Sequence, residues 1–157
     1  MPEQKVKFTE QQANMWDFYG KPDTAVFITT NGTVKTNKNA VMGKGNAKEA
    51  QDKFLNLATI LGEALSAAQD SKQPLTVMWV KEHGIGTFPV KHNWYDKADI
   101  KLIEQSCRGI LSLAGMLKWK TIVLPRPGCG NGGLNWEEEV KPILAKYLDE
   151  RFIIVNK

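Results

Sequence analysis

Apolar residues recur along the chain at two spacings, and these predict strands that alternate with helices. Dense apolar runs rich in β-branched and aromatic residues predict strands at 24–30, 75–80, 86–90, 121–124 and 151–155, after a short edge strand at 6–8. Apolar residues three and four positions apart predict helices over 47–68, 103–117 and 136–148. This alternation is typical of a three-layer α/β/α domain around a mixed, mostly parallel central sheet.

Polar residues at the start of two helices predict where each begins. The pairs that match a capping arrangement are Asn46 with Glu49 and Asn135 with Glu138. Pro142 lies about two turns into the last helix, where its missing N–H and its ring would cost about 3 kcal/mol. That penalty disappears only if the helix kinks or begins later than its apolar pattern.

The composition describes one ordinary soluble domain. A chain of 157 residues can build its own core, and 42% apolar with 24% charged residues is normal for a globular protein. The two cysteines, Cys107 and Cys129, lack a metal-type spacing, so a reduced, cytoplasmic setting is expected. The N-terminal residues lack a signal peptide's apolar core, and no run approaches the roughly 18 apolar residues of a membrane span.

The net charge is mildly positive. Lys and Arg outnumber Asp and Glu by 21 to 17, which gives +4 and a pI near 9.0. The lysines are scattered rather than clustered, so the excess favours anionic ligands without identifying one. Nucleic-acid binding stays open as an alternative, and its affinity would fall steeply with salt.

Two glycine-rich segments each lie between a predicted strand region and a predicted helix. The first glycine loop is Val41–Ala47, and the second is Leu124–Trp136. Glycine lets backbone amides approach a ligand closely, and a helix that follows such a loop favours anions at its N-terminus. Neither segment fits a P-loop or the G-x-G-x-x-G fingerprint. Two such loops at the carboxyl edge of one sheet predict a diphosphate ligand.

These two loops, in this order, resemble those of the macro domain, the ADP-ribose-binding module. The resemblance covers nearly the whole chain and implies a single macro domain over residues 1–157. It also implies that the first loop passes under the diphosphate and distal ribose, and that the second completes the site. ADP-ribose, free or attached to a substrate, is then the expected ligand, with no cofactor and no metal.

Within the family, the chain is most similar to the branch of terminal ADP-ribose protein glycohydrolase and the antitoxin that removes ADP-ribose from DNA. The segment Phe88–Trp94 is similar to the one in which that branch carries a catalytic lysine, which falls on Lys91. One difference is that members using the lysine have an aspartate where this chain has Gly132. Since loss of one member of a catalytic unit can cost orders of magnitude in rate, binding is better supported than that chemistry.

The resemblance assigns the remaining site residues. Lys91 is the catalytic candidate, with Asn39 as a further candidate near the distal ribose, and Asp17 beside Phe18 is expected to read the adenine amino group. The expected ligand-binding residues are Asp17, Phe18, Asn39, Val41, Met42, Gly43, Lys44, Gly45, Asn46, Pro125, Arg126, Gly128, Cys129, Gly130, Asn131 and Gly132.

Several of these residues have an ordinary structural alternative. A lone lysine such as Lys91 is commonly a surface residue, and Asp17 beside a glycine turn can cap or shape that turn. Cys129 lies in an electropositive loop that could lower its pKa, yet no histidine is placed to activate it, so a packing role is favoured. His83 and His92 lack the partners of a metal site.

The functional hypotheses belong to three classes. The first is a hydrolase that cleaves an ADP-ribosyl bond on protein or nucleic acid, or that acts on ADP-ribose-1''-phosphate. The second is a reader that binds ADP-ribose without chemistry, and the third is a nucleic-acid-binding protein. A monomer that acts on ADP-ribose or an ADP-ribosylated substrate, with ADP-ribosylated nucleic acid included and without a membrane, is expected.

Overall fold

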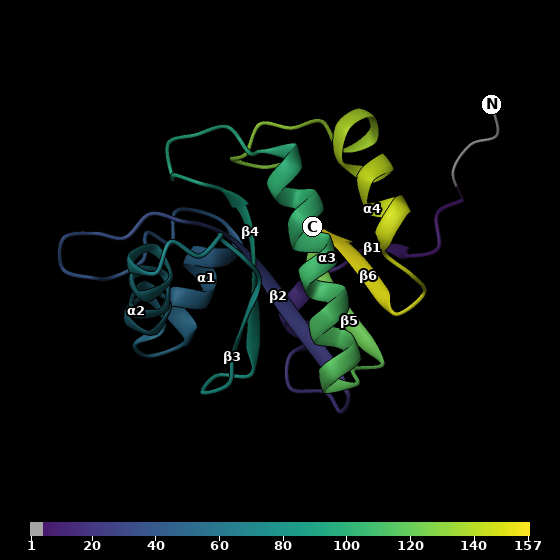
Figure 1. Cartoon of the computed structure of the whole chain (residues 1–157). Coiled ribbons are helices and arrows are strands. Elements are labelled where there is room, and N and C mark those ends of the chain that lie inside the picture. The colour runs from purple at the N-terminus through teal and green to yellow at the C-terminus, as the bar shows by residue number, and fades with distance from the viewer. Residues whose placement is uncertain (1–4) are drawn as a thin grey trace.

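A six-stranded sheet forms the centre of the protein, whose computed structural model describes residues 5–157 (Figure 1). The strands lie in the order β1-β6-β5-β2-β4-β3. Their bounds are Thr9–Gln12 (β1), Thr24–Asn31 (β2), Met78–Val80 (β3), Ile85–Lys91 (β4), Thr121–Pro125 (β5) and Phe152–Asn156 (β6). All neighbouring pairs are parallel except β3 with β4, so the predicted mixed, mostly parallel sheet is confirmed.

Helices cover both faces of the sheet. The 3₁₀ turn η1 (Met15–Phe18) and the helices α1 (Asn46–Lys53) and α2 (Leu57–Asp70) pack on one face around Ile28 and Leu61. On the other face, α3 (Ile100–Leu117) and α4 (Lys141–Tyr147) enclose a second core. Figure 1 shows these two pairs of helices on opposite sides of the strands. The predicted three-layer α/β/α architecture is confirmed.

Three predicted elements differ from the structure near the N-terminal half. The edge strand expected at 6–8 is wrong, because β1 begins at Thr9, where pairing with β6 starts. The helix expected over 47–68 is two helices, since α1 ends at an extended Phe54 and α2 starts after Asn56, which is left-handed with φ 63°. The strand expected over 75–80 is shorter, because β4 pairs only with Met78–Val80.

A π turn resolves the expected conflict at Pro142. The turn η2 (Trp136–Val140) has a side-chain cap from Asn135, whose Oδ1 accepts from the Glu138 N–H at 2.9 Å, as predicted. Helix α4 begins only at Lys141, so Pro142 falls in its first turn, where the missing N–H needs no partner. The penalty of an interior proline is therefore avoided.

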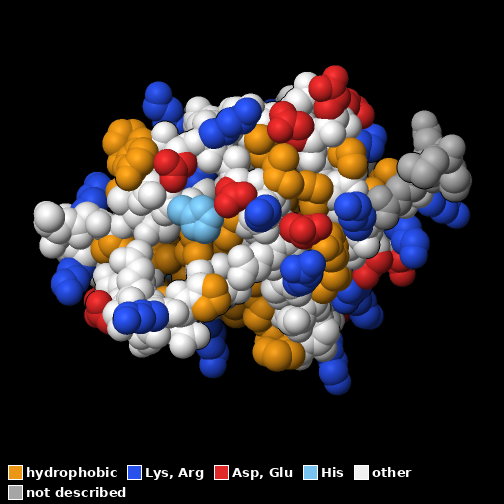
Figure 2. Space-filling view, turned by 45° about the horizontal axis from the view of Figure 1, so that its top comes forward, with side chains coloured by type: hydrophobic (Ala, Val, Ile, Leu, Met, Phe, Trp, Pro, Cys, Tyr) orange, Lys and Arg blue, Asp and Glu red, His pale blue; other side chains and the backbone are white. Residues whose placement is uncertain are grey.

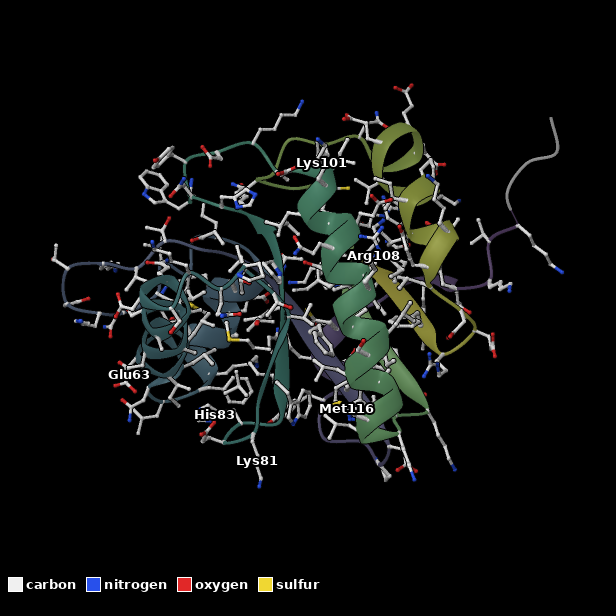
Figure 3. All side chains as sticks on the ribbon, viewed as in Figure 1. Glu63, Lys81, His83, Lys101, Arg108 and Met116 are labelled. Carbon is white, nitrogen blue, oxygen red and sulfur yellow. The ribbon has the colours of Figure 1, made fainter. Side chains whose placement is uncertain are left out.

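The carboxyl ends of three neighbouring strands meet at one edge of the sheet. Strand β2 ends at Asn31, β4 at Lys91 and β5 at Pro125, and all three are mutually parallel through β2. Both glycine loops and the loop from β4 to α3 leave from this edge. In Figure 3, Lys101 marks the start of α3 on this side, whereas Met116 and His83 lie at the opposite end of the molecule.

Candidate ligand-binding site

Two adjoining cavities open at the carboxyl edge of the sheet. The larger has a volume of about 650 Å³ and the smaller a volume of about 380 Å³. Gly45, Asn46, Arg126 and Gly130 line both, so one elongated ligand can extend from one cavity into the other. Volumes of this size are typical of small-molecule sites.

Two asparagines fix the first glycine loop. Asn46 Oδ1 accepts from the Thr29 N–H at 2.8 Å, which joins the start of α1 to the end of β2. Asn31 Nδ2 donates to the Val41 carbonyl at 2.9 Å and so holds the start of the loop. The predicted capping pair of Asn46 and Glu49 is wrong, because Gly45 is the N-cap residue and makes no side-chain cap bond.

Gly45 has a backbone conformation that other residues avoid. Its φ of 72° and ψ of −140° lie in a region that is essentially restricted to glycine. An added Cβ would meet no atom within 4 Å, so the requirement concerns backbone angle rather than space. The loop thereby turns sharply into α1 and exposes its own backbone to both cavities.

The second glycine loop is packed against itself and against its neighbours. A Cβ at Gly132 would lie 2.4 Å from the Gly128 carbonyl oxygen. The Gly128 carbonyl accepts from the Leu134 N–H at 2.9 Å, and the Gly132 carbonyl accepts from the Ala98 N–H at 2.9 Å. This fold of the loop therefore excludes any side chain at Gly132, including the aspartate of the related branch.

Lys91 ends β4 inside the larger cavity. Its Nζ donates to the carbonyl oxygens of Trp94 and Asn131, both at 3.3 Å. A register shift after Thr30 places Asn31 opposite Lys91, so the ends of β2 and β4 bring these two side chains to the same cavity. The amine thus lies between the second glycine loop and the loop that follows β4.

The loop between β4 and α3 supplies cavity residues that the sequence does not single out. Trp94, Tyr95 and Asp96 line the larger cavity. Asn31, which in the sequence forms a turn-type dipeptide with Gly32, also lines it. Asp96 is the only acidic residue among those lining this cavity, with its Oδ2 accepting from the Asn93 backbone N–H at 3.2 Å. The sequence feature that could have indicated this loop is its position directly after the segment that contains Lys91.

Arg126 lies where the two cavities meet and is held in place by Trp136 and Glu10, which line neither cavity. Its guanidinium is 5.0 Å from the centre of the Trp136 ring and 3.5 Å from Glu10 Oε1. Glu10 also contacts Lys141 at 2.7 Å and accepts from Trp136 Nε1 at 2.9 Å. Burial acts to raise the pKa of Glu10, but these hydrogen bonds and the charges of Lys141 and Arg126 outweigh it and lower that pKa.

Cys129 lies beside the smaller cavity but is not a reactive thiol. Burial raises its pKa to about 11, against a smaller opposing effect of Arg126. The group is protonated at neutral pH, which agrees with the packing role favoured from the sequence. Among residues 5–157, no three His, Cys, Asp or Glu side chains gather as metal ligands do.

Most of the predicted ligand-binding residues line the cavities, and four do not. Those in the larger cavity, besides the catalytic candidate Lys91, are Met42, Gly43, Lys44, Gly45, Asn46, Arg126, Gly128, Gly130, Asn131 and Gly132. Pro125 and Cys129 line the smaller one. Asp17, Phe18, Asn39 and Val41 line neither cavity, and their roles stay predictions from the resemblance.

Two of these four lie in other surroundings. Asp17 is exposed within η1, and Asn39 accepts from the Thr59 hydroxyl at 2.8 Å.

Basic side chains are spread over the face drawn in Figure 2 with acidic ones among them, as the scattered lysines predict. No helix among the described residues has the length and hydropathy to cross a membrane.

Comparisons with known proteins point to one family. The Macro domain model matches residues 36–143, which is more than half of the chain. A DNA ADP-ribosyl transferase-DNA ADP-ribosyl glycohydrolase fusion protein from Thermosipho africanus is 26% identical over 145 residues, covering 79% of this chain and 37% of that protein. A DNA ADP-ribosyl glycohydrolase from Mycobacterium tuberculosis is 23% identical over 134 residues, covering 81% and 36%. The chain thus spans little more than a third of either relative.

Solved structures share the fold over nearly the whole chain. The macrodomain of Thermus aquaticus DarG superposes with a TM-score of 0.67 at 23% identity, covering 98% of this chain and 99% of that one. DarTG of Thermosipho africanus, solved in complex with ADP-ribose, gives a TM-score of 0.68 at 22% identity, covering 98% and 42%. With its two glycine loops at one sheet edge, the chain belongs to the macro-domain family of ADP-ribose-binding modules.

Proposed function

We propose that this protein binds ADP-ribose attached to a nucleic-acid base and hydrolyses the bond that joins the two. The observation that carries the proposal is the position of Lys91. Its amine lies in the larger cavity, between the second glycine loop and the loop that follows β4, where a diphosphate and ribose would bind. The relatives named as DNA ADP-ribosyl glycohydrolases favour nucleic acid over protein as the substrate.

The shape of the site supports a dinucleotide-like ligand. The two cavities adjoin at Gly45, Asn46, Arg126 and Gly130, where a diphosphate would lie between its two sugars. Backbone amides of the glycine loops and the Arg126 guanidinium are suited to anionic oxygens. The distal ribose would then lie in the larger cavity beside Lys91, and the adenosine in the smaller one.

The contacts of Lys91 suit it to react at the anomeric carbon. Carbonyl oxygens of Trp94 and Asn131 accept from Nζ and hold it in the larger cavity, and the form that reacts would be the amine with a free lone pair. The nitrogen would form a bond to the anomeric carbon as the bond to the base breaks. The base leaves with the electron pair and takes up a proton. Water then releases ADP-ribose and restores the amine.

Replacing Lys91 with Ala tests the proposal. We expect the release of ADP-ribose from a mono-ADP-ribosylated oligonucleotide to fall by about two orders of magnitude or more, because a nucleophile is removed. Calorimetric affinity for free ADP-ribose should change little, since the glycine loops remain. Lys101→Ala is the matched control, because this exposed lysine lies on the same side of the molecule but lines neither cavity.

A reader without catalysis is the second candidate, and one observation favours it. Gly132 cannot carry the aspartate that the related branch uses, since its Cβ would clash with the Gly128 carbonyl. If the wild type binds ADP-ribose but releases it no faster than Lys91→Ala, the reader is the correct function. If calorimetry finds no binding of ADP-ribose at hundreds of micromolar, both candidates are wrong.

A further inference from the structure

Two neighbouring aromatic side chains are exposed at the rim of the larger cavity. Trp94 is 56% exposed and Tyr95 is 68% exposed, and both line the cavity. The other large hydrophobic residues that are exposed among 5–157, such as Leu55 and Met116, line neither cavity. An exposed aromatic pair is unusual on a protein surface and commonly marks a contact site.

The backbone holds this pair in place. The Trp94 N–H donates to Thr33 Oγ1 at 2.9 Å, and the Trp94 carbonyl accepts from Lys91 Nζ at 3.3 Å. The pair therefore begins one hydrogen bond away from the amine that we expect to react. A group attached to the anomeric carbon beside Lys91 would leave the cavity next to these rings.

The geometry of the rings suits one flat group. The centres of the Trp94 and Tyr95 rings are 5.7 Å apart, and their planes make an angle of 84°. Because the rings are nearly perpendicular, a flat group stacked on one of them meets the edge of the other. The pair forms a corner that can receive a single unstacked base, whereas a base within a duplex already has neighbours on both faces.

The charges around the corner favour a nucleic acid over an acidic or neutral peptide. Exposed lysines occur on each segment that borders it: Lys35 and Lys38 follow Thr33, Lys44 lies in the first glycine loop, and Lys97 follows the pair. None of these four forms a salt bridge with any described residue. The nearby carboxylates are engaged, since Asp96 accepts from Asn93 and Asp99 is 3.0 Å from His92.

We propose that Trp94 and Tyr95 form a stacking corner for the base that carries ADP-ribose. This rests on the proposed function and assigns it a specificity site at the rim of the larger cavity. Aromatic side chains that stack on bases, combined with lysines that follow the backbone, are the usual means of binding single strands.

The test compares Trp94→Ala and Trp94→Phe with the wild type on three ligands. These are free ADP-ribose, a single-stranded oligonucleotide with ADP-ribose on one base, and a mono-ADP-ribosylated protein. For Trp94→Ala we expect kcat/KM on the oligonucleotide to fall about tenfold or more, as loss of one stacking contact does elsewhere. Calorimetric affinity for free ADP-ribose and release from protein should fall much less than release from the oligonucleotide, and Trp94→Phe should recover most of the loss. Leu55→Ala, an exposed apolar residue outside both cavities, is the control.

The outcomes separate the corner from the proposed function. An unchanged kcat/KM on the oligonucleotide, or an equal loss on all three ligands, would overturn the corner and leave the hydrolase in place. A larger loss on the protein substrate would mean that a peptide occupies this position. If the wild type releases nothing but binds the modified oligonucleotide at least about tenfold more tightly than free ADP-ribose, and Trp94→Ala removes that gain, the hydrolase fails and the corner stands.

Discussion

The two glycine loops use the same residue for different physical reasons. In the first loop, Gly45 has open space around it and is needed for its backbone angles, while the asparagines at 31 and 46 hold the loop through side-chain hydrogen bonds. In the second loop, Gly132 is needed because backbone atoms leave no room for a Cβ. One loop is shaped by conformation and the other by packing, although both read as glycine-rich.

The largest effect is expected from Gly132→Asp, which also tests whether the aspartate of the related branch can be restored. Its Cβ would overlap the Gly128 carbonyl, so the loop must move, at a cost of about 3 kcal/mol or more in the free energy of unfolding. We expect a lower melting temperature and weaker binding of ADP-ribose by calorimetry. A variant as stable as the wild type and faster in ADP-ribose release would show that the loop adapts.

A smaller effect is expected from Gly45→Ala. Alanine in this conformation, which is essentially restricted to glycine, costs about 1–3 kcal/mol, but its methyl group meets no neighbour. Gly115→Ala is the matched control, because Gly115 lies in α3 with open space and an ordinary φ, where alanine stabilises by about 0.5–1 kcal/mol. Thermal unfolding of both variants should therefore shift in opposite directions. Equal shifts would contradict a conformational role for Gly45.

The smallest effect is expected from Glu10→Gln, which alters the charges behind Arg126. The pKa of Glu10 lies below its ordinary value of 4.5, so its charge stabilises the folded state above that value and ceases to do so as the pH falls through the lowered pKa. At neutral pH the free energy of unfolding of the wild type should exceed that of the variant by no more than about 1 kcal/mol, since the ion pairs are partly exposed. Denaturant unfolding across the acid range should show this difference vanish. A difference that persists in strong acid would require a cause other than charge.

Much of the fold could be predicted from the sequence because it rests on local periodicity. The alternating spacing identified the layers, and Pro142 indicated that the last helix kinks or begins later than its apolar pattern, as the π turn before α4 bears out. The break between α1 and α2 could not be predicted, because the apolar stripe continues across it although Phe54 is extended and Asn56 is left-handed. Local patterns do not report such a conformation in a residue other than glycine.

The candidate site was predicted where it follows the chain and missed where it depends on pairing across the sheet. Lys91 and the glycine loops lie in continuous segments, and the structure brings them to one cavity. Asn31 joins them only through a register shift opposite Lys91, which no local pattern contains. Asp17 shows the converse, because a position inferred from resemblance lies on an exposed turn outside both cavities.

Hydrogen bonds join the loop between β4 and α3 to the segment before the first glycine loop and to the second glycine loop. The Trp94 N–H reaches Thr33 before the first loop, and the Ala98 N–H reaches Gly132 in the second. The three segments therefore lose their conformational entropy when the protein folds rather than when a ligand arrives. Free energy gained from ligand contacts then appears as affinity instead of being consumed by ordering loops. The ordering of this rim therefore contributes to the free energy of folding rather than to that of ligand binding.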